Sequence, residues 1–125
     1  MIRFEVETKE DAYNLTASVQ KIGDDFLVAI WGGEKPHIGA VSVAQPRPSL
    51  KDPNALSASA SVFCMIGHKE DELAKAASEI LAATLNSSIV VTAGIHWDNL
   101  KKEGIQKIIK NTGILVEKIL DNIQL

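Results

Sequence analysis

Hydrophobic and polar residues alternate along the first part of the chain, which is the pattern of half-buried β-strands. Ile2, Phe4 and Val6 alternate with charged residues, and residues 13–22 repeat the alternation after a polar turn. Residues 26–31 are almost continuously apolar, as is typical of a central strand. The pattern therefore predicts three consecutive strands.

Two more strands are predicted at residues 37–44 and 57–64. The connection between them, residues 45–55, holds three prolines, and because proline has no N–H we expect it to stay outside the sheet. Alternating small side chains at 57–64 predict that a helix or a ligand packs close to that strand. Cys64 is the only cysteine of the chain, and its apolar surroundings predict a small buried side chain in a protein of a reducing compartment.

The last third of the chain changes to helical periodicity. Residues 73–84 place apolar side chains on one helical face after an acidic first turn, and residues 89–93 form a short β-branched strand. A second amphipathic helix follows, with Asp98 or Asn99 as the expected N-cap. The order is five strands, helix, strand, helix, which predicts an α+β fold: a mostly antiparallel sheet of about six strands with two helices on one face.

Length and charge narrow the class of protein. The chain has 125 residues, the usual size of one domain, so we expect a single domain over residues 1–125. A net charge of -3 and the lack of a basic run argue against nucleic acid as the main partner. The charged N-terminal residues do not resemble a signal peptide, and no apolar run approaches the ~20 residues of a membrane span. These features predict a cytoplasmic protein with no membrane partner.

All three histidines of the chain lie at predicted strand boundaries. His37 opens the fourth strand, His68 follows the fifth and His96 follows the sixth. A strand–helix–strand connection normally makes parallel neighbours, so the ends of the fifth and sixth strands should share one edge of the sheet. If the fourth strand pairs antiparallel with the fifth, its start lies at the same edge. The sequence therefore predicts that the three histidine-bearing loops meet.

Several residue types in these loops suit ligand binding. Histidine is a common metal ligand, although the spacing of these three shows no helical i, i+4 pair. Gly33 permits close approach of a ligand to the backbone, and Lys35 adds a positive charge. Trp97 and Trp31 flank the loops and offer faces for a flat ring. For each of these side chains, a structural role in the core or a solvated position is the alternative interpretation.

Motifs for catalysis are missing from the sequence. It holds no Gly-x-Ser-x-Gly turn, no phosphate-binding P-loop and no dinucleotide fingerprint. We therefore predict a binding protein that is not an enzyme. A metal-dependent enzyme that uses the histidines, with Asp98 or Glu70 as acid–base group, is the less favoured alternative.

Residues 32–41, 67–72 and 93–99 resemble the corresponding segments of the LpdD-like prenylated-flavin chaperones. This resemblance implies a non-enzymatic partner of UbiD-type decarboxylases that binds prenylated FMN and helps to deliver it to the apoenzyme. It also implies a homodimer with a fold similar to that of proteasome assembly chaperones. A protein-interaction module of that second kind is therefore the alternative function.

The resemblance also gives roles to individual residues. It implies that His37, His68 and His96 lie next to the cofactor, directly or through a divalent metal that bridges to its phosphate. Lys35 and the backbone amides of the loops, including that of Gly33, would assist. Trp97 or Trp31 would face the flavin ring.

Overall fold

The computed structural model describes residues 2–65 and 70–123. Six strands and two helices follow one another in the predicted order, with five strands before the first helix. Their bounds are β1 Arg3–Glu7, β2 Leu15–Ile22, β3 Asp25–Gly33, β4 Ala40–Pro48, β5 Leu56–Cys64, α1 Asp71–Leu85, β6 Ile89–His96 and α2 Lys102–Ile123.

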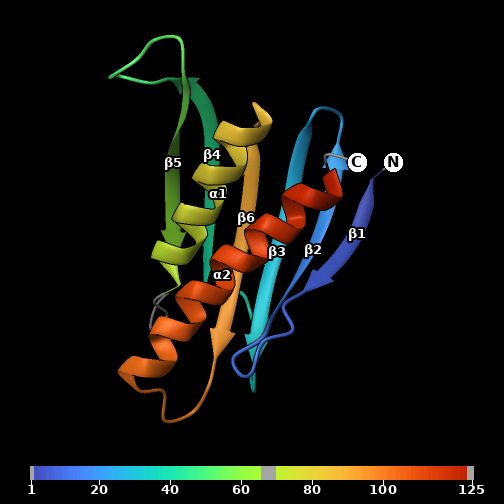
Figure 1. The fold of residues 1–125 in the computed structure, drawn as a ribbon, viewed down its shortest axis with the longest axis vertical. Helices are drawn as coiled ribbons and strands as arrows, with labels where there is room; N and C mark the ends of the chain where they lie inside the picture. The colour runs from blue at the N-terminus through green and yellow to red at the C-terminus, as the bar shows by residue number, and fades with distance from the viewer. Residues whose placement is uncertain (1, 66–69, 124–125) are drawn as a thin grey trace.

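The strands form one sheet in the order β1-β2-β3-β6-β4-β5, and both helices lie on the same face of it (Figure 1). β3 and β6 are parallel, while all other neighbouring strands are antiparallel. The expected α+β fold with a mostly antiparallel sheet is therefore confirmed. No helix in the described part of the chain is long and apolar enough to cross a membrane.

The hydrophobic core lies between the sheet and the helices. Alternate residues of the strands are buried, for example Leu15, Ala17 and Val19 on β2, because successive side chains point to opposite faces. α1 packs on β4, β5 and β6, and α2 packs on β1 and β2. The side chains of β4 and β5 that face α1 are small, so this helix packs close to the sheet. Ser42 of β4 and Ser78 of α1 share a buried hydrogen bond of 2.7 Å.

The predicted pairing of the fifth and sixth strands is wrong, because β4 lies between them. Both β5 and β6 run antiparallel to β4, so they still point in the same direction and end at the same edge of the sheet. The parallel neighbour of β6 is β3, which also ends at this edge. The ends of β3, β5 and β6 and the start of β4 therefore share one edge, although β6 pairs with β3 and β4 instead of β5.

The proline-rich segment also differs from expectation. β4 continues through Pro46 and Pro48 and pairs with β5, although proline was expected to keep the segment outside the sheet. Beyond Ala44, β4 has no pairing with β6, so a missing N–H on that side breaks no ladder bond. The remaining β4–β5 connection lies at the end of the sheet opposite to the histidine loops (Figure 1), as predicted.

Two smaller expectations fail near the strand and helix ends. Cys64 is exposed rather than buried, because it is the last residue of β5, which is an edge strand. Neither Asp98 nor Asn99 caps α2, since that helix begins at Lys102. Asn99 instead adopts a left-handed backbone conformation with φ 58° in the turn before the helix.

Candidate functional site

The candidate site lies at the edge of the sheet where β3 and β6 end and β4 begins, which we call the rim. Gly33 and His96 are register partners at the ends of the two parallel strands. Because β6 lies between β3 and β4, residues 34–39, which connect β3 to β4, must cross over the end of β6. Backbone hydrogen bonds from Glu34 N to His96 O (2.8 Å) and from Gly39 N to Ala93 O (2.8 Å) fasten both ends of this crossing.

Glycines make the crossing possible. A Cβ on Gly94 would collide with the carbonyl oxygen of His37, and a Cβ on Gly33 would collide with that of His96. Gly33 also has φ 94°, a conformation that side chains disfavour. Gly33 thus permits the close approach of the neighbouring strand, and its role toward a ligand stays a prediction.

His37 lies in the crossing loop, three residues before β4, and is fixed by two acceptors. Its Nδ1 is 2.8 Å from the carbonyl oxygen of Lys35, and its Nε2 is 2.9 Å from Oε1 of Glu70. The carbonyl oxygen of Lys35 only accepts, so Nδ1 of His37 donates this hydrogen bond. This bond holds the ring in one orientation, with 22% of the His37 side chain exposed.

Glu70 joins three parts of the rim. It occupies the position before α1 without capping the helix through its side chain, and its side chain is 9% exposed. Oε1 accepts hydrogen bonds from His37 and from the backbone N–H of Ile95 (3.2 Å), and a Cβ on Gly39 would collide with Oε2. The buried carboxyl group therefore fastens the crossing loop and the end of β6 to the start of α1.

His96 belongs to a second and more exposed cluster. Its Nε2 lies 2.9 Å from Oδ1 of Asp98, the same oxygen that is 3.9 Å from the Nζ of Lys35. The backbone N–H of Asp98 donates to Oε2 of Glu34 at 3.3 Å. The hydrogen bond from His96 lowers the pKa of the Asp98 carboxyl below its usual range, and Lys35 acts in the same direction. The cluster thus places the Lys35 ammonium group and the His96 ring beside two carboxyl groups, those of Asp98 and Glu34.

Trp97 packs inward. Its ring meets that of Tyr13 edge-on, with centroids 5.0 Å apart and an interplanar angle of 77°, and it covers Gly32 and Gly33. Asn111 of α2 donates to the carbonyl oxygens of Ala12 and Tyr13, which holds this loop in place. Trp31 lies on the other face of the sheet, because its register partner Thr16 alternates with the buried residues of β2. The two tryptophans therefore do not share one surface.

The structure brings His37, His96 and Lys35 to one rim, as the sequence predicted, while His68 lies outside the described residues. Among the residues that are described, no three histidine, cysteine, aspartate or glutamate side chains are placed to hold a metal ion. His37 and His96 bond to different carboxylates, Glu70 and Asp98. The described rim accordingly fits hydrogen bonding and ion pairing better than metal coordination.

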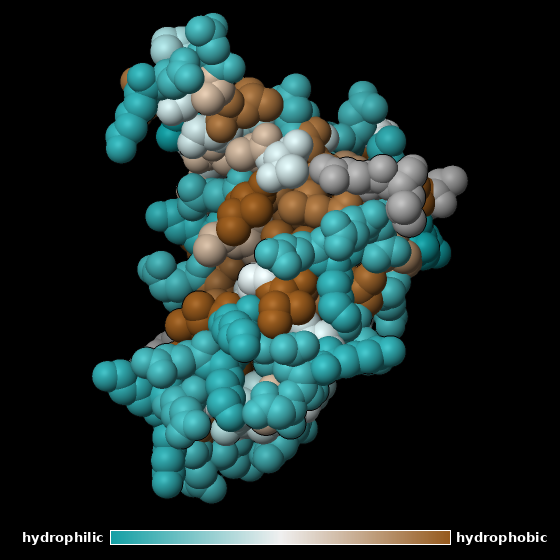
Figure 2. Space-filling model, in the orientation of Figure 1, coloured by the Kyte–Doolittle hydropathy of each residue, from teal (hydrophilic) through white to brown (hydrophobic). Residues whose placement is uncertain are grey.

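An apolar groove, which was not expected from the sequence, lies between α1 and α2 and opens at the rim. Its volume is about 590 Å³, and Glu70 and His96 lie at its polar end. Aliphatic side chains make most of its wall, and Figure 2 shows hydrophobic residues gathered along the line between the two helices. Ile105, Ile108 and Ile109 have the ordinary i, i+3, i+4 spacing of one apolar helix face, so the sequence does not distinguish a groove wall from a contact with the core.

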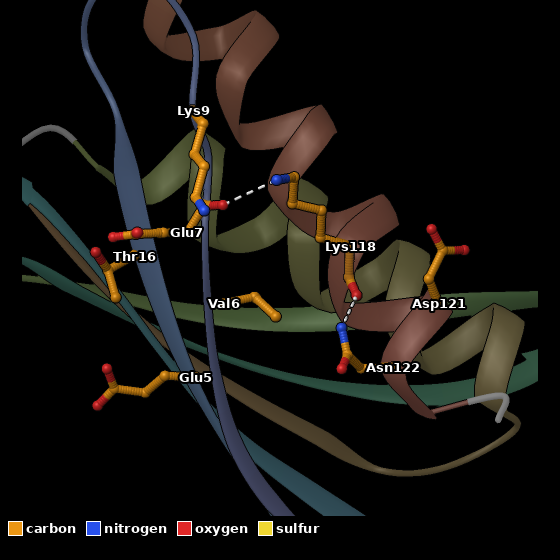
Figure 3. Close-up of a pocket in the computed structure, with 8 residues that line it drawn as sticks. All are labelled: Glu5, Val6, Glu7, Lys9, Thr16, Lys118, Asp121 and Asn122. Carbon is orange, nitrogen blue, oxygen red and sulfur yellow. Dashed lines mark hydrogen bonds between the residues drawn. The ribbon is translucent and has the colours of Figure 1, made fainter.

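A second cavity, of about 580 Å³, lies between β1 and the end of α2 (Figure 3). Its wall mixes both signs of charge, with Glu5, Glu7 and Asp121 near Lys9 and Lys118. The ammonium group of Lys118 is bound to the carbonyl oxygen of Glu7 at 3.0 Å. None of the predicted site residues lines this cavity, so the rim and its groove remain the candidate site.

Comparisons with known proteins agree with the fold and with the family resemblance. Residues 9–124 match the family model of the prenylated flavin chaperone LpdD-like domain. Protein LpdD of Lactiplantibacillus plantarum is 26% identical over 117 residues, which are 94% of this chain and 82% of that protein. A chain of a chaperone complex for yeast 20S proteasome assembly has a similar fold, with a TM-score of 0.51 and 13% identity over 99% of this chain and 97% of that one. Because the family model spans almost the whole chain, this protein belongs to the LpdD-like family of prenylated flavin chaperone domains.

Proposed function

We propose that this chain is a non-enzymatic chaperone that binds prenylated FMN and helps to deliver it to a UbiD-type decarboxylase. The family membership supports a chaperone role. The observation that carries the ligand assignment is the groove between α1 and α2, which joins an aliphatic wall to the polar rim. In this proposal the protein acts as a cytoplasmic homodimer.

The residues present fit the two halves of such a ligand. A volume of about 590 Å³ lies within the usual range for sites of small molecules and cofactors. The wall contributed by Leu73, Ala76, Ile105 and Ile109 suits a prenylated ring system, whose burial is driven by the hydrophobic effect. At the polar end, the exposed carboxyl group of Glu72 offers an acceptor for hydroxyl and ring N–H groups.

The phosphate is assigned to the exposed cluster of the rim. Lys35 and His96 both contact Asp98, and their side chains are 70% and 42% exposed. A phosphate offers these donors a stronger acceptor than one carboxylate does, so it would take over the contacts that Asp98 now makes. The negative charge of Asp98 then repels the bound phosphate, so replacing Asp98 by asparagine should strengthen binding.

Cofactor binding is tested with the purified chain and with variants on the groove wall. Ala76→Phe fills the groove from α1, and Lys75→Phe adds the same ring to the neighbouring position, which does not line the groove. After co-expression with a flavin prenyltransferase, we expect the wild type and Lys75→Phe to retain the absorbance of prenylated FMN and Ala76→Phe to lose it. A colourless wild type at saturating cofactor, or an Ala76→Phe variant that binds equally well, would contradict the proposal.

The remaining parts of the proposal need separate measurements. Transfer is measured as activation of a UbiD-type apodecarboxylase by the loaded chain, compared with free cofactor at the same concentration. Metal content of the purified protein and of a variant with all three histidines changed to alanine tests the predicted divalent metal. A protein that binds no cofactor but forms stable complexes with proteasome subunits would favour the alternative interaction module, for which the similar fold is the argument.

A further inference from the structure

A tyrosine in the loop between β1 and β2 adopts a backbone conformation that favours glycine. Tyr13 has φ 57°, in the left-handed region that a bulky side chain rarely occupies. Such a conformation lowers stability and persists only where the surrounding structure enforces it, most often at a functional site. The loop lies at the rim, because Leu15, the first residue of β2, pairs with Gly32 of β3 (Figure 1). The ring of Tyr13 is therefore held at the rim against the preference of its own backbone.

Hydrogen bonds on both sides of Tyr13 enforce this conformation. Asn111 of α2, which is buried, donates to the carbonyl oxygens of Ala12 (2.9 Å) and Tyr13 (2.8 Å). On the other side, the amide oxygen of Asn14 accepts a hydrogen bond from Oγ1 of Thr8 at 2.8 Å. A glycine or an asparagine would adopt the same backbone at lower cost, so the backbone alone does not account for a tyrosine here.

The ring of Tyr13 fills the space between Trp97 and the first turn of α2. Its centroid lies 5.0 Å from that of Trp97, and the edge-to-face angle of 77° is a favourable arrangement for two aromatic rings. The far end of the ring lies against α2 at Gly104, where a Cβ would come within 2.9 Å of the Tyr13 hydroxyl oxygen. The tyrosine thus holds the tryptophan ring from the side of α2.

Trp97 stands between two residues of the exposed cluster of the rim. His96 and Asp98 flank it in the chain, and their side chains bond to each other at 2.9 Å. The ring of Trp97 packs against the hydrophobic core and over Gly32 and Gly33. Because the middle residue of a three-residue segment is anchored in this way, the tryptophan ring determines where the backbone places the residues on either side.

We propose that Tyr13 is a positioning residue of the rim, which acts through Trp97 to hold His96 and Asp98 where a phosphate meets them. The proposal rests on the proposed function, which assigns the phosphate of the cofactor to this cluster. Side chains that are held in place before a ligand binds lose less freedom when it binds. Loss of the Tyr13 ring should therefore reduce what the phosphate adds to affinity and spare what the groove wall adds.

Calorimetric titration with FMN and with riboflavin tests the proposal, because these two ligands differ only in the phosphate. We expect Tyr13→Ala to reduce the preference for FMN over riboflavin at least about fivefold, the cost of ordering two side chains, and to leave the affinity for riboflavin nearly unchanged. Tyr13→Phe keeps the ring and should keep the preference. Phe4→Ala removes a partly buried ring of β1 from the core and controls for a general loss of stability.

Amide hydrogen exchange gives a second measurement, made without a ligand. The N–H of Asp98 donates to Oε2 of Glu34 at 3.3 Å, and the N–H of Glu34 donates to the carbonyl oxygen of His96 at 2.8 Å. In Tyr13→Ala, both amides should exchange at least about tenfold faster, because these bonds open when the segment around residue 97 moves. The N–H of Ser88, bound to a carboxylate at the opposite end of the sheet, should keep its rate, whereas a general loss of stability would raise all three rates.

Two results would overturn the proposal. One is a Tyr13→Ala variant in which the amides of Glu34 and Asp98 exchange as in the wild type, and the other is a preference for FMN that falls no further than in Phe4→Ala. If Tyr13→Ala fails to fold, Tyr13→Leu, which keeps an apolar side chain without a ring, replaces it in both measurements. A wild type that binds neither flavin, together with faster exchange in the Tyr13 variant, rejects the proposed function and sustains the positioning of the cluster by Tyr13.

Discussion

Removing the buried carboxyl group of Glu70 should cost about 3 kcal/mol of stability. In Glu70→Ala, the backbone N–H of Ile95 and the ring of His37 both lose a hydrogen-bond partner in a part-buried setting. An unsatisfied buried group costs about 1–3 kcal/mol, so two part-buried groups in the lower half of this range give the expected loss. Glu70→Gln keeps an oxygen where Oε1 now lies and loses mainly the charge, and we expect it to cost about 1 kcal/mol.

Denaturant unfolding near neutral pH measures both variants against the wild type, with Glu117→Ala as a control. Glu117 is an exposed carboxylate on α2, and its removal should change stability by less than about 0.5 kcal/mol. The slope of the unfolding free energy with denaturant should stay constant across the series, which shows that the same surface is exposed. If Glu70→Ala cost no more than Glu117→Ala, or if Glu70→Gln cost as much as Glu70→Ala, the structural role assigned to this carboxyl group would be refuted.

Three further predictions follow from other parts of the structure. In α2, Gly113→Ala should raise stability by about 1 kcal/mol because nothing lies within 4 Å of its new Cβ. Gly104→Ala should raise stability less or lower it, because its Cβ would lie 3.0 Å from Cζ of Tyr13, whose ring packs on Trp97; denaturant unfolding checks both. An NMR titration should find the pKa of Asp98 below its usual value of about 4, and closer to it in His96→Ala. Since a lowered carboxyl pKa stabilises the fold above the usual value, this contribution should disappear as the pH falls through the lowered one. Finally, Asp98→Asn should tighten the binding of FMN roughly fivefold, because it removes the repulsion between two like charges, and an unchanged or weaker affinity in calorimetry would count against the phosphate assignment.

Local patterns in the sequence were sufficient for the elements and for most of the rim. Alternation marked the strands, and the apolar periodicity of residues 73–84 marked α1, because both signals depend only on neighbouring residues. The shared edge of His37 and His96 followed from strand direction. This prediction is correct although the predicted neighbour of β6 is wrong. β4 runs antiparallel to both β5 and β6, so its start lies at the edge where both of those strands end.

The position of β6 in the middle of the sheet was not accessible from these patterns. Pairing of Val28 with Val91 and of Ser42 with Val91 joins segments that are far apart in the chain, and no local rule selects them. Gly94 reflects this arrangement, because a Cβ there would collide with the backbone of His37 where the β3–β4 loop crosses β6. In the sequence, a glycine inside a strand indicates that another segment comes close to it, but it does not indicate which segment this is.

The groove depends on still longer-range information. Ile105 and Ile109 looked like part of the buried face of a helix, and they are 47% and 56% exposed. Whether such residues are buried depends on how far apart α1 and α2 lie on the sheet, and this distance follows from the strand order rather than from either helix. The same holds for Leu27 and Val43, whose exposure depends on which face of the sheet the helices leave open.

The two described histidines should therefore differ in what they do, although they lie at the same edge. His37 is locked between the Lys35 carbonyl and a buried carboxyl group, so it positions the crossing loop on the end of β6. His96 bonds to an exposed aspartate that a ligand can replace. Replacement of His37 by alanine should thus lower stability and cofactor affinity together, whereas replacement of His96 should lower affinity and leave the unfolding midpoint nearly unchanged. If the two substitutions lowered stability equally, the assignment of a structural role to His37 and a ligand-binding role to His96 would be wrong.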